Sequence, residues 1–406
     1  MALDVTAVRA RFPGLAQEVN GKPLVYLDNG ATSQKPDVVL QTMDDHYRED
    51  CSNVHRGVHV LSQRATTAME AGRETVRRFL NARETSECVF VRGTTEGINL
   101  VANTFGQSLE PGDEILVTRM EHHSNIVPWQ LLCERTGAIL QVAEIDERGE
   151  IIMDDLTAKL SDRTRLVSVV HVSNALGTIN PVEEIIELAH GVGARVLIDG
   201  AQAAVHMPVD VQALDCDLYV FSGHKTYGPT GIGVLYGKHE LLAQLPPWEG
   251  GGDMIRSVSF EGTTYSEPPA RFEAGTPNIA GIIGLGAALE FLMELGLDEI
   301  ASHEADLLDY GHQRLREIEG LRLVGTARQK ASILGFTMDC AHPHDIGTIL
   351  DHEGVAIRAG HHCAQPVMDH FGVPATARAS FGVYNTLEDV DRLVDALGTA
   401  QEIFGP

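Results

Sequence analysis

The sequence predicts an α/β fold: a large domain with a mainly parallel sheet of seven strands, followed by a smaller C-terminal α+β domain. The chain has 406 residues, which exceeds one typical domain and suggests two or three. Short runs rich in Val, Ile and Leu alternate with helical patterns through the middle of the chain, as in strand–helix–strand units. From about residue 290 this alternation stops, and long amphipathic helices flank shorter strands.

The strand candidates of the large domain are short runs rich in Val, Ile and Leu, whose alternation with helical patterns argues for a mainly parallel sheet. Seven runs fit this description: Cys88–Val91, Glu114–Thr118, Ile139–Val142, Leu166–His171, Arg195–Ile198, Leu218–Phe221 and Gly233–Tyr236. Between them, apolar residues recur with a helical period at Thr95–Phe105, Asn125–Thr136 and Val182–Val192.

The C-terminal part is expected to form the small domain. Two long amphipathic patterns, Asp298–Ile318 and Thr386–Phe404, flank shorter strand-like segments. No internal repeat or low-complexity linker separates the two parts. We expect the large domain at residues 26–290, and a small domain that combines residues 1–25 with residues 291–406.

Composition favours a cytoplasmic protein. The net charge of −26, from 31 basic and 57 acidic side chains, argues against non-specific binding to nucleic acids or anionic membranes. The six cysteines are scattered without a CxxC pair, which indicates a reducing compartment. The N-terminus lacks the basic start and apolar core of a signal peptide. The most apolar stretch, Ile279–Leu297, carries Glu290, Glu294 and four glycines, so we expect a buried helix rather than a membrane span.

Lys225 is the first candidate functional residue. It follows the apolar run Leu218–Phe221 after two small residues and a histidine. A lysine at the mouth of a buried strand is desolvated, which lowers its pKa and frees its amine to form a Schiff base with a carbonyl cofactor. The alternative is an ordinary strand-end lysine that points into water. The ends of the neighbouring strands decide between the two, because ligands bind at the carboxyl ends of parallel strands.

Two other strand ends carry polar residues that fit the same kind of cofactor. Asp199 follows an apolar run, where a carboxylate needs a partner such as a protonated pyridine nitrogen or a magnesium ion. No GxxxxGK[ST] loop is present, which counts against a nucleotide phosphatase. Thr94 and Thr95 open a helix, as either a phosphate site or an ordinary N-cap. Together with Lys225, these residues predict a site for pyridoxal phosphate (PLP).

Motifs at these positions resemble those of fold-type I PLP enzymes of the class V aminotransferase group. The matching segments are Thr94-Thr95-Glu96, Glu121-His122, Asp199-Gly200-Ala201-Gln202 and Ser222-Gly223-His224-Lys225. Within that group, Arg358-Ala359-Gly360-His361-His362-Cys363 resembles the group II cysteine desulfurases of the SufS type. The similarity spans nearly the whole chain, with the motifs in the same order.

The resemblance implies a role in PLP binding for each matching residue. Lys225 would hold PLP and transfer protons, His122 would stack on the ring and assist, and Asp199 would keep the ring nitrogen protonated. The other expected contacts are Gln202 to the ring hydroxyl, Thr95, Ser222 and His224 to the phosphate, and Thr276 to the phosphate of the other subunit. Shared sites of this kind imply a homodimer.

The resemblance also implies how the substrate is held. The guanidinium of Arg378 would form a bidentate pair with the substrate carboxylate, a geometry that arginine favours. Asn174 and Arg358 complete the expected substrate site. Without the motif, a surface salt bridge would be the better interpretation of Arg378.

Cys363 narrows the reaction. The other five of the six cysteines are expected in apolar strand- or helix-like settings, where an inert thiol is usual. Cys363 lies on a turn, after Gly360 and two histidines, and positive neighbours such as Arg358 favour a thiolate. A thiolate there can attack the sulfur of PLP-bound cysteine and leave alanine and a persulfide. The resemblance thus implies a cysteine desulfurase, with L-cysteine as substrate, that supplies sulfur for iron–sulfur cluster assembly.

The compact segment Arg358–Pro366 implies slow sulfur release without an acceptor protein. In SufS relatives that work with a zinc-bound SufU acceptor, a segment similar to Ala341-His342-Pro343-His344-Asp345 supplies a histidine that takes over a zinc ligand position. Here that histidine would be His344. The alternative is a helix N-terminus with incidental histidines.

Three other functions remain open. A selenocysteine lyase would use the same cofactor and the same cleavage. A generic aminotransferase would leave Cys363 without a role. A zinc metalloprotein could use residues that are ligands by type, namely His342, His344, His361, His362 and Cys363.

Overall fold

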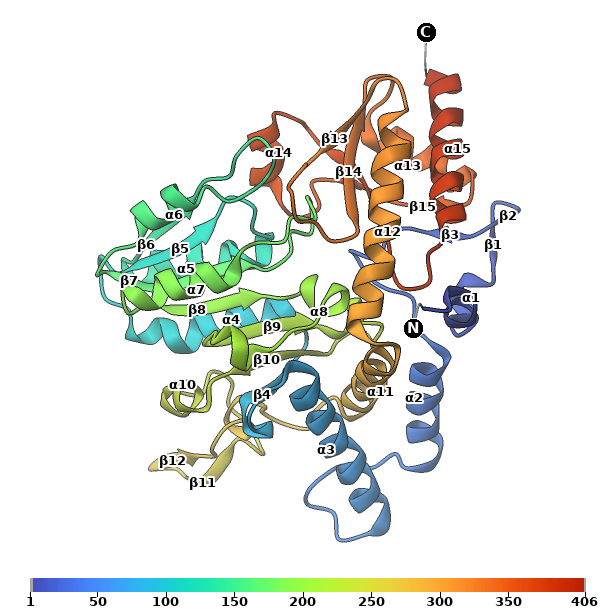
Figure 1. Ribbon diagram of the computed structural model, residues 1–406. Helices are drawn as coiled ribbons and strands as arrows, with labels where there is room; N and C mark the ends of the chain where they lie inside the picture. The colour runs from blue at the N-terminus through green and yellow to red at the C-terminus, as the bar shows by residue number, and fades with distance from the viewer. Residues whose placement is uncertain (1–2, 405–406) are drawn as a thin grey trace.

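The computed structural model describes residues 3–404, and its largest unit is a seven-stranded sheet (Figure 1). The strand order is β4-β10-β9-β8-β7-β5-β6, and only β10 runs against the other six. Every strand begins and ends within two residues of its predicted bounds. The strands are β4 (Cys88–Val91), β5 (Glu114–Thr118), β6 (Ile139–Ala143), β7 (Thr164–Val170), β8 (Arg195–Asp199), β9 (Leu218–Ser222) and β10 (Gly233–Gly237).

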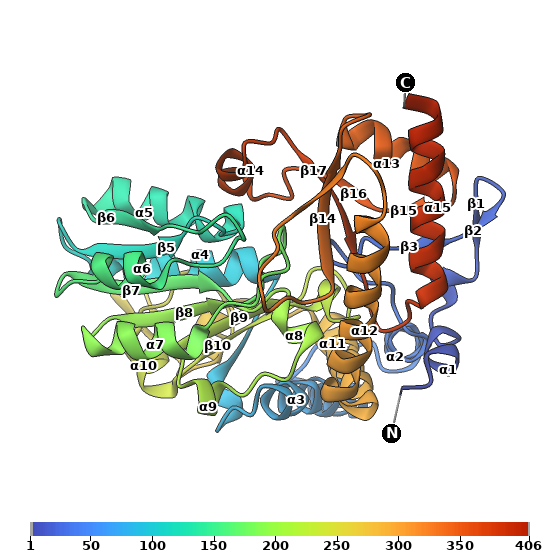
Figure 2. The ribbon, with the colours of Figure 1, turned by 45° about the horizontal axis from the view of Figure 1, so that its top comes forward.

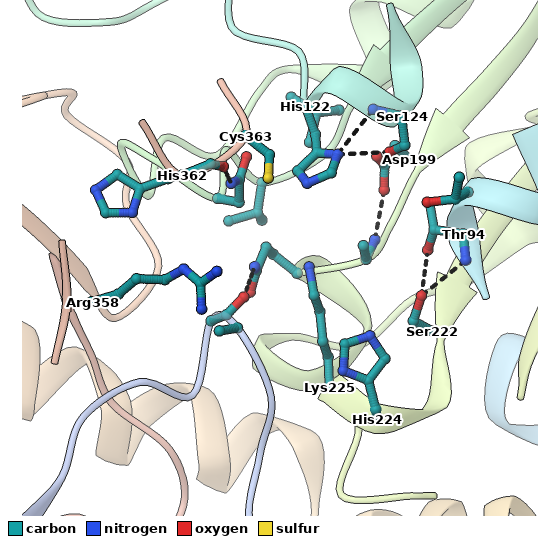
Figure 3. A pocket seen from close by; sticks show the side chains of 18 of the residues that line it. Thr94, His122, Ser124, Asp199, Ser222, His224, Lys225, Arg358, His362 and Cys363 are labelled. Atoms are coloured by element: carbon teal, nitrogen blue, oxygen red, sulfur yellow. Dashed lines mark hydrogen bonds between the residues drawn. The ribbon is translucent and has the colours of Figure 1, made fainter. Parts of the chain in front are cut away.

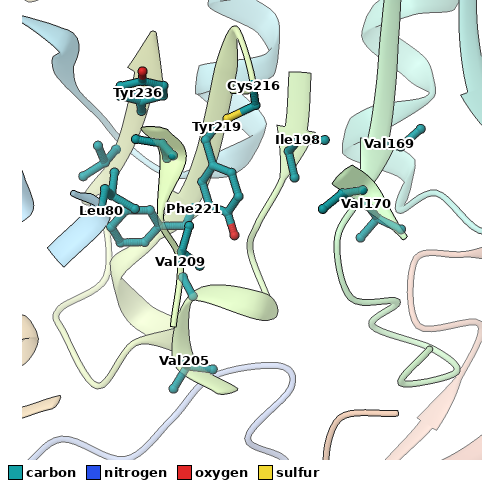
Figure 4. Close-up of a cluster of buried hydrophobic side chains, with 14 of the residues drawn as sticks. Leu80, Val169, Val170, Ile198, Val205, Val209, Cys216, Tyr219, Phe221 and Tyr236 are labelled. Carbon is teal, nitrogen blue, oxygen red and sulfur yellow. The ribbon is translucent and has the colours of Figure 1, made fainter. Parts of the chain in front are cut away.

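Helices cover both faces of this sheet, which is why its strands are apolar on both sides. In β9, Tyr219 and Phe221 belong to one core, whereas Leu218 and Val220 belong to the other. Figure 4 shows Tyr219 and Phe221 in the first core. The helices over that face are α3 (Val60–Leu80), α7 (Val182–Gly191), α8 (Ala203–His206), α9 (Val211–Leu214) and α11 (Ile279–Leu295). Those over the opposite face are α4 (Thr94–Thr104), α5 (Val127–Thr136) and α10 (His239–Gln244). We call the sheet and these helices the large domain.

One predicted helix differs at its start. The pattern over Asn125–Thr136 becomes a 3-10 turn, His123–Asn125, followed by α5. The His122 side chain accepts a hydrogen bond from the N–H of Ser124, which fixes the turn separately from the helix. Pro128 then occupies the first turn of α5, where its missing N–H has no intrahelical partner to lose. The turn therefore holds His122 and His123 at the edge of the sheet.

The small domain is a four-stranded antiparallel sheet with helices packed on it. Its strand order is β13-β14-β17-β16: β13 (Leu321–Val324), β14 (Ile333–Met338), β17 (Thr376–Ser380) and β16 (Arg358–Gly360). Its helices are α12 (Leu297–Arg316), α13 (Pro343–His352) and α15 (Leu387–Phe404), and α14 (Gln365–Phe371) lies beyond the sheet (Figure 2). In the register of β16 and β17, Arg358 lies opposite Arg378.

The N-terminal segment joins the two domains. Strand β3 (Val25–Tyr26) pairs with β15 (Val355–Ala356) of the small domain. Phe12 packs edge-on against Phe291 and Tyr384, with ring centroids 5.7 and 4.6 Å away. The α-helices and strands not yet named are α1 (Val5–Arg9), β1 (Glu18–Val19), β2 (Lys22–Pro23), α2 (Asp37–Glu49), α6 (Met153–Lys159), β11 (Ile255–Ser259) and β12 (Gly262–Tyr265).

Among residues 3–404, no single helix is long and apolar enough to cross a membrane. Helices α11 and α12 meet that test of length and composition only when they are joined across a 75° bend. The expected burial of the most apolar stretch is confirmed, since α11 contributes Leu285, Leu289 and Leu292 to the core of the large domain.

Candidate active site

A cavity of about 210 Å³ lies at the carboxyl edge of the large sheet, where residues of the small domain close it (Figure 3). All the predicted site residues line this cavity except Thr276 and His344. Those that line it are Thr95, His122, Asn174, Asp199, Gln202, Ser222, His224, Lys225, Arg358, Cys363 and Arg378. The topology therefore brings together side chains that are far apart in the sequence.

Lys225 and Asp199 meet because β8 and β9 are parallel neighbours. Asp199 is the last residue of β8, and Lys225 ends a 3-10 turn, Gly223–Lys225, that follows β9. The carbonyl oxygen of His224 accepts hydrogen bonds from the N–H of Ser33, at 3.0 Å, and from Nζ of Lys35, at 2.9 Å. These contacts fix the peptide that precedes Lys225.

Burial sets the protonation of both groups. It lowers the pKa of Lys225 to about 8, and the nearby Asp199 carboxylate opposes this shift. Burial raises the pKa of Asp199, while the N–H of Ala201, 2.9 Å from Oδ1, and the Lys225 amine oppose that shift. A neutral amine at Lys225 is thus accessible near neutral pH, which a nucleophilic lysine requires.

The start of α4 lies at the end of the cavity away from Arg358 (Figure 3). Its N-cap, Gly93, has φ of 154° and supplies no side-chain hydrogen bond to the helix. The Oγ atom of Ser222 accepts from the N–H of Thr94 at 2.9 Å and lies 2.9 Å from the Thr94 hydroxyl. The next N–H groups of the helix have no intrahelical partner, so a phosphate can bind there.

His122 lines the cavity as a neutral ring. Its Nδ1 accepts from the N–H of Ser124 at 3.0 Å and lies 2.8 Å from the Ser124 hydroxyl. Burial, reinforced by the charge of Lys225, lowers the pKa of His122 to about 3. A neutral aromatic ring with a fixed tautomer suits stacking on a planar cofactor.

Arg378 is almost fully buried at 2% exposure, and its carboxylate partner is not evident from the sequence. Asp28 Oδ1 accepts from Arg378 at 3.1 Å, and its Oδ2 lies 3.6 Å from the Arg358 guanidinium. Burial raises the pKa of Asp28 and lowers that of Arg378, while their mutual attraction opposes both shifts. Asp28 follows β3, and only the fold shows that this strand leads it to β17.

Cys363 is exposed and enters the cavity from the small domain, opposite Lys225 (Figure 3). The prediction for the other cysteines was partly wrong. Cys51 is exposed outside any helix or strand, because the segment after α2 leaves the core. Cys133 and Cys340 are only half-buried, and Cys216 is buried in a loop rather than in an element. Burial raises the pKa of Cys216 beyond its usual range, so that thiol stays protonated.

Unpartnered buried atoms test whether PLP and an amino acid fit the cavity. Gln202 donates from Nε2 to the Gly30 carbonyl, and its Oε1 has no partner in the described part of the chain, so it can accept from a ring hydroxyl. Nε of Arg378 is likewise unpaired and can donate to a carboxylate. Asn174 fits less simply, because Nδ2 already donates to the His362 carbonyl and the unpaired atom is the acceptor Oδ1. Gln202 Oε1 and Arg378 Nε are therefore available to a ring hydroxyl and to a substrate carboxylate.

Thr276 and His344 lie elsewhere. Thr276 lines a separate pocket with Arg92 and Glu96. His344 is exposed in the first turn of α13, where the ring of His342 caps the helix by accepting from the His344 N–H at 3.2 Å. The helix N-terminus expected as the alternative is therefore present, and it leaves the His344 ring accessible.

The residues named above as possible zinc ligands do not form a metal site. Within residues 3–404, no group of three or more His, Cys, Asp or Glu side chains is placed to hold a metal ion. His362 is buried, and its Nε2 lies 2.8 Å from the Thr376 hydroxyl. Burial and the charge of Arg378 lower the pKa of His362 to about 3.

Comparison with known proteins gives consistent relatives. The family model described as Aminotransferase class-V matches residues 25–393. A cysteine desulfurase of Synechococcus elongatus is 55% identical over 402 residues, which are 99% of this chain but 64% of that relative's length. A cysteine desulfurase of Escherichia coli O8 is 53% identical over 100% of both chains. The crystal structure of the cysteine desulfurase CsdA from Escherichia coli matches with a TM-score of 0.93 at 42% identity, over 100% of both chains.

Proposed function

Since the chain belongs to the aminotransferase class-V family, we propose that it is a cysteine desulfurase. It would convert L-cysteine to L-alanine and carry the sulfur as a persulfide on Cys363, for iron–sulfur cluster assembly. The observation that carries the proposal is that Lys225 and Cys363 reach one cavity from different domains. An aminotransferase needs the lysine but has no use for a thiol at that place.

The cofactor of this family, PLP, supplies an electron sink for the substrate α-carbon when it is bound. Lys225 would hold the cofactor and carry protons to and from the substrate carbons, which its lowered pKa favours. Arg378 would bind the substrate carboxylate through its unpaired Nε. Asp199 would face the ring nitrogen and Gln202 the ring hydroxyl, while Thr95, Ser222 and His224 would hold the phosphate.

Cys363 would perform the sulfur transfer. Its thiolate attacks the substrate sulfur, so that an S–S bond forms as the C–S bond breaks. The electron pair of the broken bond stays with the carbon skeleton, which takes up a proton and leaves as alanine. His122 and Lys225 are the groups placed to move that proton.

We also assign the chain to the group II, SufS-type enzymes and to a homodimer. The short segment Arg358–Pro366, which runs from β16 into the start of α14, supports the first assignment, because it leaves no long mobile loop around the thiol. The position of Thr276 outside its own chain's cavity supports the second, since it would serve the phosphate of a second copy. Exposed apolar side chains that such a copy would cover include Val58 and Phe260.

An acceptor protein is the third part of the proposal. Helix α13 packs against β16, which leads directly to Cys363, and the exposed His344 opens that helix. A zinc-bound SufU-like acceptor would then meet His344 while it approaches the thiol. We expect His344→Ala to keep basal alanine formation and to lose activation by such an acceptor, whereas His352→Ala at the other end of α13 should keep both. Equal activation of the wild type and His344→Ala would remove this role.

The test of the cofactor and reaction uses the colour of the protein and alanine formation. The purified wild type should be yellow and should form alanine from L-cysteine, and Lys225→Ala should lose both properties. Lys238→Ala is the matched control, because Lys238 pairs with Asp215 and does not line the cavity. A colourless wild type, or one that forms alanine only from selenocysteine, would contradict the proposal.

A further inference from the structure

The loop that carries the thiol has a strained backbone. His362 and Cys363 are consecutive non-glycine residues with φ of 53° and 55°. The left-handed conformation is unfavourable for an L-residue and persists only where surrounding contacts hold it in place. We call residues 361–365 the thiol loop, because they include Cys363.

Contacts from the large domain hold the thiol loop at three points. The N–H of His123 donates to the Cys363 carbonyl at 2.7 Å. The N–H of Gln365 donates to Nε2 of the His123 ring at 3.1 Å. Nδ2 of Asn174 donates to the His362 carbonyl at 2.6 Å. Two of these contacts belong to the same residue, His123, which holds the loop at the Cys363 carbonyl and at the Gln365 N–H.

The ring of His123 can act in this way only when it is neutral. Nε2 accepts from a backbone N–H, so the proton must lie on Nδ1. Desolvation lowers the pKa of His123, and the neighbouring His361 lowers it further, so the neutral ring is favoured. Gln365 is the first residue of α14, and its N–H has no partner within that helix. His123 supplies the missing acceptor.

His123 is also tied to the cofactor side of the cavity. His123 begins the 3-10 turn that the His122 side chain caps. His122 lines the cavity, whereas His123 contacts the loop. Glu121, just before this turn, is fully buried and accepts from Asn125 Nδ2 at 2.6 Å and from the Val170 N–H at 3.1 Å. The turn is therefore a fixed base from which one ring reaches the cofactor site and the other reaches the thiol loop.

We propose that His123 is a positioning residue that clamps the thiol loop in its left-handed conformation and so keeps the Cys363 sulfur at the cavity. The inference rests on the proposed function, because the position of the thiol matters only if it receives sulfur. In this role His123 contacts neither the substrate nor the cofactor.

Two substitutions of His123 distinguish the effect of its hydrogen bond to Gln365 from the effect of its packing volume. His123→Gln keeps an acceptor oxygen at about the reach of Nε2, whereas His123→Leu keeps the volume and removes the acceptor. Both keep the backbone hydrogen bond to Cys363. Loss of one such bond corresponds to about a tenfold effect. We expect kcat for alanine formation to fall about tenfold in His123→Leu with KM for cysteine unchanged, and His123→Gln to recover most of the loss.

Amide hydrogen exchange in the yellow holoenzyme, without cysteine, tests the clamp independently of the reaction. The Gln365 amide should exchange about tenfold faster in His123→Leu and at the wild-type rate in His123→Gln. His361→Leu is the matched control, because its ring makes no hydrogen bond within residues 3–404, and it should leave that amide unchanged. Unchanged exchange in His123→Leu, or equal losses in both His123 variants, would overturn the inference. If even the wild type forms no alanine, the proposed function fails, while the exchange result still decides the clamp.

Discussion

At the scale of one residue, Lys330 shows how burial without a neighbouring opposite charge lowers the pKa of a lysine. Its side-chain nitrogen donates to the carbonyl oxygens of Leu176 and Gly325, and no carboxylate among residues 3–404 pairs with it. Burial lowers its pKa from 10.5 to about 7. Leu176 lies in the segment 173–178, which also carries Asn174 at the cavity. Lys330 therefore connects a loop of the small domain to the site.

This pKa predicts a pH dependence of stability. Between about pH 7 and 10.5 the unfolded chain binds the proton that folded Lys330 has lost, so the free energy of unfolding rises with pH. In Lys330→Met this contribution disappears. We expect calorimetry to show Tm rising more steeply with pH in the wild type than in Lys330→Met across this window. Parallel curves for the two proteins would contradict the lowered pKa.

Single side chains also show how far the sequence could predict the site. Asp199 and Lys225 were predictable together, because both follow apolar runs and parallel strands share a carboxyl edge. Asp28 and His123 were not recognised as partners of Arg378 and of the thiol loop. Their contacts span 350 and 242 positions of the chain, and no local pattern reveals them.

At the scale of elements, the close approach of α4 to the sheet positions the phosphate end of the cavity. A Cβ at Gly97 would lie 2.6 Å from Cγ2 of Val220 in β9, so only glycine permits this approach. Gly97 comes three residues after Thr94, whose N–H meets Ser222. The distance between helix and strand thus sets the geometry of the predicted phosphate site.

Replacing this glycine should separate the helix from the sheet. We expect Gly97→Ala to lower the free energy of unfolding by about 1–3 kcal/mol through overpacking, and to weaken cofactor binding. Gly191 in α7 is the matched control, since a Cβ there meets nothing within 4 Å. Gly191→Ala should raise stability by up to about 1 kcal/mol, because it removes the entropic cost of a helical glycine. Denaturant unfolding and PLP titration would measure both effects, and equal stability changes would contradict the close-packing argument.

Strand bounds were well predicted because strands buried on both faces leave an unbroken apolar run that ends at the first polar or small residue. The 3-10 turn before α5 was missed, since its cause is a side-chain contact between His122 and Ser124 rather than apolar periodicity. The exposure of Cys51 was also missed, although its polar neighbours Asp50 and Ser52 indicate a segment outside the core.

At the scale of the whole molecule, two domains deliver different halves of the chemistry to one cavity. The large sheet supplies Lys225, Asp199 and the start of α4, whereas the small domain supplies Arg378 and Cys363. Strand β3 and the side chain of Phe12 connect the two domains and so fix the position of one relative to the other. The residue bounds of the domains, 26–290 against 1–25 with 291–406, stay a prediction, as does the cytoplasmic location.

The most direct test follows the sulfur atom itself. When the holoenzyme is mixed with L-cysteine without reductant, mass spectrometry should find one added sulfur on the Cys363 peptide, with alanine formed in equal amount. Cys363→Ala should stay yellow and lose sulfur release, while Cys51→Ala, which removes the other exposed thiol, should behave as the wild type. Sulfur on a different cysteine, or full turnover by Cys363→Ala, would contradict the central claim that this thiol receives the sulfur.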